Sequence, residues 1–317
     1  MSAVCYHRVE TPDGWVLPVQ VRSRAEATGV PVLVVPGYGM NSHLFRNSPM
    51  GPSLSEFLCD AGHPVWTVDL RGQGGSRPTR DTSHEPTLQH QITQDVSSVV
   101  AYARRIHAQQ KLALFGCSLG GSIALAHVAL NGDDGLAGVI TVGSPLTWEG
   151  VHPLLRAMGS SRLVSEFLRP RGLRDFAERA APLLRIAPQA LSPYLNVDNI
   201  DLDVLPQLIQ TIEDPLPGVN RDIAQWLKSG KLHVEGLDVA DAIGNATVPL
   251  LTVLANRDGI VPTASAASAL TRWGGPTTRL DVGDEERWYA HADLFVGRYA
   301  NRDVFAPIRD WLAALDD

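Results

Sequence analysis

The sequence has few cysteines and no excess of positive charge, and both shortages narrow its class. Its three cysteines, Cys5, Cys59 and Cys117, are an odd number without C-x-x-C spacing, which argues against a disulfide framework or a zinc ribbon. Twenty-seven basic against 34 acidic residues give a formal net charge of −7, so the chain lacks the positive surface that attracts nucleic acid or an anionic membrane. We expect no nucleic acid partner and no stable membrane insertion.

Long hydrophobic runs are also missing. The N-terminal residues have no apolar signal-peptide core, and the longest apolar stretches fall short of the roughly 18 residues that a membrane-spanning helix needs. We therefore expect a cytoplasmic protein in a reducing compartment. With 317 residues, 44% of them hydrophobic and 19% charged, the chain has enough apolar material to fold around a large core.

The sequence does contain a regular alternation of strand-like and helix-like segments. Two strand-like runs flank a turn signal at 11–14, which predicts an antiparallel hairpin over residues 3–23. This order predicts βαβ units and a mostly parallel, doubly wound α/β sheet. The later strand patterns cover 30–35, 64–68, 112–115, 136–142, 248–255 and 278–282, and the helical patterns cover 52–59, 87–109 and 118–129.

Between residues 146 and 244 the strand pattern disappears, and a helical pattern rich in proline replaces it. We interpret residues 146–244 as a helical cap inserted into a core made of residues 1–145 and 245–317. Within the insertion, residues 162–185 mix arginine with leucine, phenylalanine and alanine. That stretch is either an amphipathic surface that meets lipid or a hydrophobic substrate, or the solvated face of a cap packed on the core.

A G-x-S-x-G motif at Gly116–Gly120 is the strongest chemical signal. It lies directly after a strand pattern and directly before a helical one, the context in which the serine stands exposed on a sharp turn. The helix N-terminus behind Ser118 favours an anion that forms there. We predict that Ser118 is a nucleophile, and the alternative is an ordinary helix N-cap serine in a tight turn.

A serine hydroxyl needs a base within reach and a group that orients the base. His291 is the only histidine after His233, so a C-terminal base would have to be His291. Asp258, just past the strand pattern at 248–255, is the predicted acid. Four acidic residues on or after the last strand pattern lie closer to His291 in sequence and are rivals of Asp258: Asp281, Asp284, Glu285 and Glu286. Glu149, which follows an earlier strand pattern, is the alternative acid.

An oxyanion that forms at Ser118 needs hydrogen-bond donors aimed at it. One predicted donor is the backbone N–H of Leu119, the residue after the nucleophile. The other is the backbone N–H of Tyr38, in the glycine-rich segment that follows the strand pattern at 30–35.

The same glycine-rich segment imitates a dinucleotide-binding fingerprint, but the match fails. Ser42 stands where the third glycine belongs, and Asp69 lies 32 residues beyond Gly37, where about 20 is usual. No Walker A, H-E-x-x-H or EF-hand spacing occurs in the sequence. We expect neither a cofactor nor a metal.

Taken together, these segments resemble the α/β-hydrolase fold superfamily. Residues 36–42 resemble its oxyanion loop, residues 61–72 the strand and turn that follow, residues 116–121 the nucleophile elbow, and residues 249–262 the strand before the acid. The stretch over residues 41–66 is similar to acid lipases and to polyhydroxyalkanoate synthases. Synthases carry a cysteine nucleophile, whereas this elbow carries Ser118, with Cys117 as a buried, structural neighbour.

The resemblance implies an α/β-hydrolase fold with a cap, a triad in the order Ser118, Asp258, His291, and hydrolysis of a small-molecule ester with a hydrophobic acyl group. Such a serine esterase or lipase works through an acyl-enzyme. The same triad also serves acyltransferases, thioesterases, lactonases and polyhydroxyalkanoate-related enzymes. A non-catalytic binder of hydrophobic ligands on the same fold is the alternative of another class.

Overall fold

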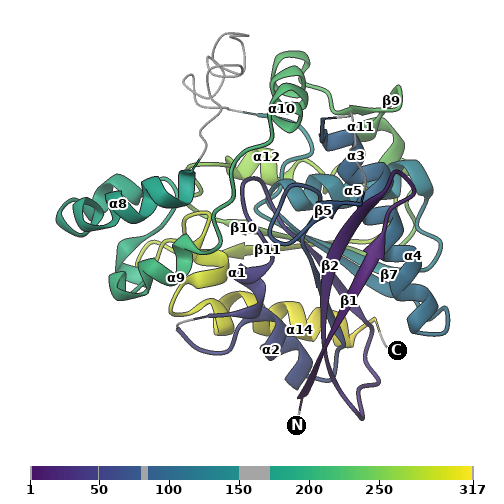
Figure 1. The fold of residues 1–317 in the computed structure, drawn as a ribbon, viewed down its shortest axis with the longest axis horizontal. Helices are drawn as coiled ribbons and strands as arrows, with labels where there is room; N and C mark the ends of the chain where they lie inside the picture. Colours follow the sequence, from purple (N-terminus) through teal and green to yellow (C-terminus); the bar gives the residue numbers. More distant parts are fainter. Residues whose placement is uncertain (1, 49, 80–84, 150–171, 316–317) are drawn as a thin grey trace.

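A single mixed sheet runs through the centre of the molecule. The computed structural model describes residues 2–48, 50–79, 85–149 and 172–315 (Figure 1). Neighbouring strands from β4 to β11 are parallel, whereas β1–β2 and β2–β4 are antiparallel, and the short β5 (Arg77–Pro78) pairs with β2. The strand order is β1 (Ser2–Glu10), β2 (Trp15–Arg24), β4 (Val65–Val68), β3 (Val32–Val35), β6 (Leu112–Cys117), β7 (Leu136–Val142), β10 (Leu250–Ala255) and β11 (Thr277–Val282).

Helices cover both faces of this sheet, as the predicted α/β architecture requires (Figure 1). The α-helices described are α1 (His43–Arg46), α2 (Leu54–Asp60), α3 (Leu88–His90), α4 (Ser97–Ile106), α5 (Leu119–Asn131), α8 (Leu173–Ile186), α9 (Leu205–Ile209), α10 (Pro217–Ser229), α11 (Val239–Ala242), α12 (Thr263–Ala267), α13 (Asp293–Val296) and α14 (Ala306–Ala313).

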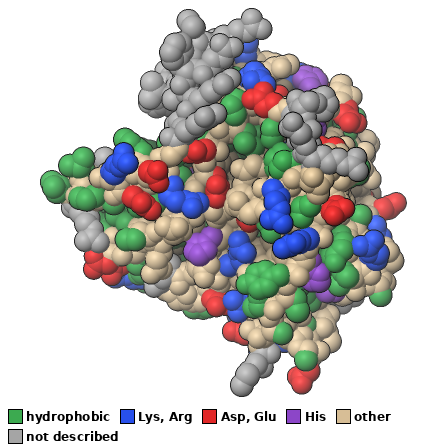
Figure 2. Space-filling model, viewed as in Figure 1, with side chains coloured by type: hydrophobic (Ala, Val, Ile, Leu, Met, Phe, Trp, Pro, Cys, Tyr) green, Lys and Arg blue, Asp and Glu red, His purple; other side chains and the backbone are tan. Residues whose placement is uncertain are grey.

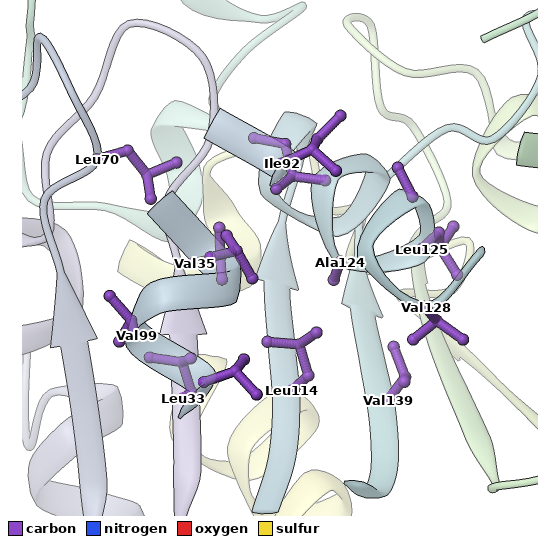
Figure 3. Packing of buried hydrophobic residues seen from close by; sticks show 14 of the residues in the cluster. Leu33, Val35, Leu70, Ile92, Val99, Leu114, Ala124, Leu125, Val128 and Val139 are labelled. Carbon is purple, nitrogen blue, oxygen red and sulfur yellow. The ribbon is translucent and has the colours of Figure 1, made fainter. Parts of the chain in front are cut away.

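The central strands are apolar on both faces because each face supports its own core. In β3, Leu33 and Val35 pack with residues of α4 and α5, in the cluster drawn in Figure 3. The alternate residues Val32 and Val34 pack with residues of α2 and α14. The period of two along a strand thus divides one apolar run between two helical layers.

The predicted N-terminal hairpin is confirmed. β1 and β2 pair in antiparallel register from Ser2 opposite Arg24 to Glu10 opposite Val16. The turn closes with hydrogen bonds between Thr11 and Trp15, and Gly14 takes a φ of +88°. A glycine is the residue that adopts this conformation without strain.

Two details differ from the sequence-based expectation. The helical pattern over 87–109 is not one α-helix, because a π-helical segment, Gln91–Val96, joins α3 to α4. The expected loss of strands between 146 and 244 is wrong at one place, where β8 (His233–Val234) pairs with β9 (Leu237–Asp238). Glu235 and Gly236 both take positive φ there, so this tight turn makes a hairpin too short to give a strand pattern.

The described part of the region predicted as an insertion consists of short helices, connecting loops and the hairpin β8–β9. Residues 150–171 lie outside the described residues, and with them part of the predicted amphipathic stretch at 162–185. The remainder of that stretch belongs to α8, which projects at the left of Figure 1, and hydrophobic side chains gather at the corresponding edge of Figure 2. Phe176, Leu183 and Ile186 of this helix are exposed. In the part of the chain that the structure describes, no helix is long and apolar enough to cross a membrane.

Candidate active site

Ser118 stands on a strained turn at the carboxyl end of β6. Its φ of 52° and ψ of −123° lie in a region that residues other than glycine rarely adopt. The turn is held by the Ser118 N–H, which donates to the carbonyl oxygen of Val142 on the neighbouring β7 at 2.8 Å. The Ser118 side chain is half-buried and follows directly on a fully buried strand.

The two glycines of the motif are needed because the chain passes so close to itself. A β-carbon on Gly116 would lie 2.3 Å from Cα of Gly121, at the start of α5. A β-carbon on Gly120 would lie 2.3 Å from the carbonyl oxygen of Val35, at the end of β3. The motif therefore packs the nucleophile turn directly against the strand that leads into the glycine-rich loop.

That glycine-rich loop lies beside Ser118. A β-carbon on Gly37 would lie 3.0 Å from Cβ of Ser118 and 3.0 Å from the carbonyl oxygen of Cys117. Tyr38 follows Gly37 directly, and Leu119 opens α5. Neither the Tyr38 N–H nor the Leu119 N–H donates a hydrogen bond to another described residue. The structure thus brings the two predicted oxyanion donors close to Ser118 and leaves their N–H groups unused.

His291 and Asp258 form a direct pair. Nδ1 of His291 lies 2.6 Å from Oδ2 of Asp258, and both side chains are buried. The other carboxylate oxygen, Oδ1, accepts the N–H groups of Ile260 and Val261, each at 2.8 Å. A carboxylate only accepts hydrogen bonds, so a hydrogen bond between the two groups requires the proton on Nδ1 and leaves Nε2 of the neutral ring without one.

The loops that carry this pair are tied together by the main chain. The Arg257 N–H donates to the carbonyl oxygen of Tyr289, and the Tyr289 N–H donates to Oδ1 of Asn256. These bonds join the two residues before Asp258 to Tyr289, which lies two residues before His291. Hydrogen bonds between the two loops therefore help to hold Asp258 next to His291.

The end of β7 connects this pair to Ser118. Val142 accepts the hydrogen bond from Ser118, and the next residue, Gly143, lies against the His291 ring. No hydrogen bond joins Ser118 to His291 among the described residues. The three predicted residues thus lie around the end of β7, and the Ser118 side chain has no hydrogen-bond partner among the described residues.

Glu149, the alternative acid, lies elsewhere. Its side chain is exposed, and its backbone exchanges two hydrogen bonds with the hydroxyl of Ser265 on α12.

Cys117 is buried behind the elbow, and burial raises the pKa of its thiol well above the ordinary value. A thiol held neutral in this way is a poor nucleophile.

Part of the predicted insertion contacts the glycine-rich loop directly. Met40 forms an isolated β-bridge with Ile212, and the Glu213 N–H donates to the carbonyl oxygen of Gly39 at 2.8 Å. The Asn41 side-chain amide donates to Oε1 of Glu213 at 2.6 Å. The residues that hold this loop therefore come from the region predicted as an insertion as well as from the sheet.

A cleft of about 670 Å³ lies next to this contact. Charged side chains line much of it, among them Glu85, Arg174, Glu213 and Asp214. Its lining is therefore not that of an apolar acyl pocket.

In the described part of the chain, no group of three or more His, Cys, Asp or Glu side chains is arranged to hold a metal ion.

Sequence reasoning missed Asp293, a carboxylate two residues after His291. It is completely buried, and burial raises its pKa to about 7, with the charge of Asp258 adding to the rise. The signal available in the sequence was only its closeness to the predicted base, which does not distinguish it from the neighbouring acidic residues.

Comparison with known proteins is consistent with this geometry. A family model described as alpha/beta hydrolase fold matches residues 30–288. A pimeloyl-[acyl-carrier protein] methyl ester esterase from Vibrio cholerae is 26% identical over 241 residues, which cover 74% of this chain and 78% of that protein. The esterase of the same name from Aliivibrio fischeri is 23% identical over 246 residues, which cover 75% and 79% of the two chains.

Solved structures share the fold over nearly the whole chain. A thermophilic esterase from Thermogutta terrifontis gives a TM-score of 0.63 at 20% identity, covering 99% of this chain and 100% of that one. A haloalkane dehalogenase from Agrobacterium tumefaciens gives a TM-score of 0.61 at 16% identity, covering 99% and 97%. The shared fold therefore carries at least two named activities, and the chemistry has to be argued from the site.

Proposed function

Since the chain belongs to the α/β hydrolase fold family, we propose that it is a serine esterase in which Ser118, His291 and Asp258 form the catalytic triad. The observation that carries the proposal is the 2.6 Å contact between His291 Nδ1 and Asp258 Oδ2, at the same sheet edge as the strained Ser118 turn. The curated relatives, which are esterases by name, support ester hydrolysis as the reaction.

In the first half of the reaction, Ser118 attacks the carbonyl carbon of the ester. Nε2 of His291 takes the hydroxyl proton as the bond forms, and Asp258 stabilises the resulting imidazolium. The negative charge that develops on the carbonyl oxygen is met by the N–H groups of Tyr38 and Leu119. The imidazolium then gives its proton to the leaving alcohol, and an acyl-enzyme remains.

In the second half, water replaces the alcohol. His291 takes a proton from the water, the hydroxide adds to the acyl carbon, and the tetrahedral intermediate collapses to release the acid. Ser118 regains its proton from His291. The same steps with an alcohol or a thiol in place of water would be acyl transfer, so the nucleophile of this second half separates the esterase from the acyltransferase alternative.

For the substrate, we propose a small-molecule ester with a hydrophobic acyl group of medium length. Each buried methylene contributes up to about 0.8 kcal/mol to binding, so activity should rise with chain length until the acyl site is filled. The curated relatives act on a methyl ester of a carrier-bound pimeloyl group, so methyl esters of medium-chain acids belong in the screen.

Kinetics of single variants test the proposal. Ser118→Ala and His291→Ala should each lower kcat on p-nitrophenyl esters, from acetate to palmitate, by at least about 10³-fold, because triad members act as a unit. Ser122→Ala is the matched control. Ser122 lies on α5, the helix that begins directly after Ser118, and its Oγ donates to the carbonyl oxygen of Pro145 at 2.6 Å, so its loss should affect stability and spare turnover. Near-normal turnover by Ser118→Ala would overturn the proposal.

A further inference from the structure

Among the described residues, Asp293 is a buried carboxylate close to His291 that the proposed reaction does not use. Its side chain is completely inaccessible to solvent. Oδ2 accepts two backbone N–H groups, from Ala290 at 2.7 Å and from Asn196 at 2.8 Å. Oδ1 is equally buried and has no hydrogen-bond partner among the described residues. No Lys or Arg in the described part of the chain forms an ion pair with Asp293.

The two N–H groups on Oδ2 come from different parts of the chain. Ala290 directly precedes His291 in the loop that carries the predicted base. Asn196 belongs to the region predicted as an insertion, about a hundred residues earlier in the sequence. One carboxylate oxygen therefore joins the base loop to the insertion.

Further bonds from the same short segment surround His291 on both sides. The Ala292 N–H donates to the carbonyl oxygen of Tyr194 at 2.8 Å, and the side-chain amides of Asn196 and Asn199 donate to the carbonyl oxygen of Trp288 at 2.8 and 2.9 Å. Residues 194–199 thus form a brace for the loop at 288–293. Asp293 is the only side chain of that loop that completes the brace, since the loop's other contributions in these bonds are backbone groups.

A buried carboxylate with one oxygen that has no partner lowers the stability of the fold. Leaving a buried acceptor without a partner lowers stability, and it does so more strongly where the group is charged. An alanine or leucine at this position would remove that cost. A carboxylate at this position makes sense if the loop needs a hydrogen-bond acceptor at the place of Oδ2, where the N–H groups of Ala290 and Asn196 meet.

We propose that Asp293 is a positioning residue for His291, acting through Oδ2 to hold the Ala290–His291 backbone at the place where Nδ1 meets Asp258. The inference rests on the proposed function for its kinetic consequence only. It requires an acceptor oxygen at this point, and it does not require a negative charge. Asparagine, whose side-chain oxygen also accepts two N–H groups, should therefore replace Asp293 in this role.

The test compares Asp293→Ala with Asp293→Asn in the full-length protein. Asp293→Ala should lower kcat per active site about 10- to 100-fold with KM changed little, because small displacements of a catalytic group slow the chemical step more than binding. Active sites are counted by labelling with a fluorophosphonate, so that a smaller folded fraction does not pass for slower turnover. Asp293→Asn should keep most of the wild-type kcat.

A second readout does not depend on hydrolysis. The proton on Nδ1 of His291, held in a short hydrogen bond to Asp258, should give a far-downfield resonance in the proton NMR spectrum. His291→Gln identifies the signal by removing it. The resonance should be lost or broadened in Asp293→Ala and retained in Asp293→Asn. If the ester assay fails for the wild type, the proposed function fails, while this resonance still decides the role of Asp293.

Asp133→Ala is the matched control. Asp133 also uses one oxygen, Oδ2, to accept two backbone N–H groups, those of Thr247 and Val248. This contact lies before the amino ends of β7 and β10, whereas the proposed site lies at the carboxyl ends of the strands. It should lose stability and keep both the resonance and the turnover of each labelled site. Asp293→Ala with wild-type turnover per site and an intact resonance would overturn the proposal, and so would an Asp293→Asn variant as impaired as Asp293→Ala.

Discussion

The backbone of Gly143 lies directly against the ring of His291. A β-carbon on Gly143 would lie 3.1 Å from Cε1 and 3.2 Å from Nδ1 of His291, closer than ordinary van der Waals contact. Gly143 also takes a φ of +57°, which side-chain-bearing residues rarely adopt. The backbone directly after β7 thus packs against the imidazole ring of His291.

Gly143→Ala should displace the His291 ring and lower kcat by roughly 10- to 100-fold, since a small misplacement of a catalytic group is enough for such a loss. Steady-state kinetics on a short p-nitrophenyl ester measure the change. Gly230→Ala is the control, because Gly230 has a φ of +74° and open space where the β-carbon would stand. It carries the same backbone strain without the clash. Equal turnover in the two variants would show that the contact with His291 does not matter.

Asp258→Asn should impair catalysis far more than Glu149→Gln. The amide cannot accept the Nδ1 proton in the same way and favours the wrong tautomer of His291, with an expected loss of at least about 10²-fold in kcat. Glu149 is exposed and should be replaceable with little effect. Both variants are compared in kcat/KM at one pH, and the reverse ranking would move the catalytic acid to Glu149.

Cys117→Ala should retain most of the activity. The thiol is 3% exposed, burial raises its pKa, and it fills space behind the elbow as a small hydrophobic group. Thiol reagents should accordingly inactivate the wild type slowly or not at all. Complete loss of activity in Cys117→Ala, together with an active Ser118→Ala, would instead make the cysteine the nucleophile.

Stability should fall as the pH rises through the range in which Asp293 titrates. Its ordinary pKa of 3.8 is raised by burial to about 7 in the folded protein, so between these values the folded state binds a proton that the unfolded state has released. The rise in pKa from 3.8 to about 7 corresponds to about 4 kcal/mol of stability that is present at low pH and lost by pH 7. Asp258 and the ring of Tyr194 are the neighbouring ionisable groups with which Asp293 interacts.

The measurement is the difference in unfolding free energy between the wild type and Asp293→Asn, taken by urea denaturation from pH 4 to pH 8. The difference isolates Asp293 from His127, whose pKa burial lowers to about 4, and from Asp95, whose pKa is raised to about 6. Asparagine should become the more stable variant as the pH rises. A difference that stays constant over this range would contradict the raised pKa.

Much of this architecture could be predicted from local sequence patterns. The sequence pattern predicts the strand over residues 136–142 at its actual bounds, and it predicts the elbow because close backbone contacts require the glycines of the motif. The hairpin β8–β9 was missed because two-residue strands leave no periodicity to detect. The π-helical segment of Gln91–Val96 was missed because it keeps the apolar spacing of an α-helix almost unchanged.

The site was predictable where one residue type was forced and unpredictable where tertiary contacts decide. His291 was the only candidate base after His233, so no knowledge of its neighbours was needed. The bracing of the glycine-rich loop by Glu213 and of the base loop by Asn196 joins segments far apart in sequence. Hydrogen bonds between such distant segments depend on the folded arrangement, and no local sequence pattern predicts them.

The most direct test of the account is the site at which an ester substrate becomes covalently attached. The protein is mixed with p-nitrophenyl butyrate, quenched in acid within the first turnover and digested, and the acylated peptide is sequenced by mass spectrometry. The account predicts a butyryl group on Ser118 in the wild type and none in Ser118→Ala. Acylation at another residue, or full turnover by Ser118→Ala without any adduct, would contradict it.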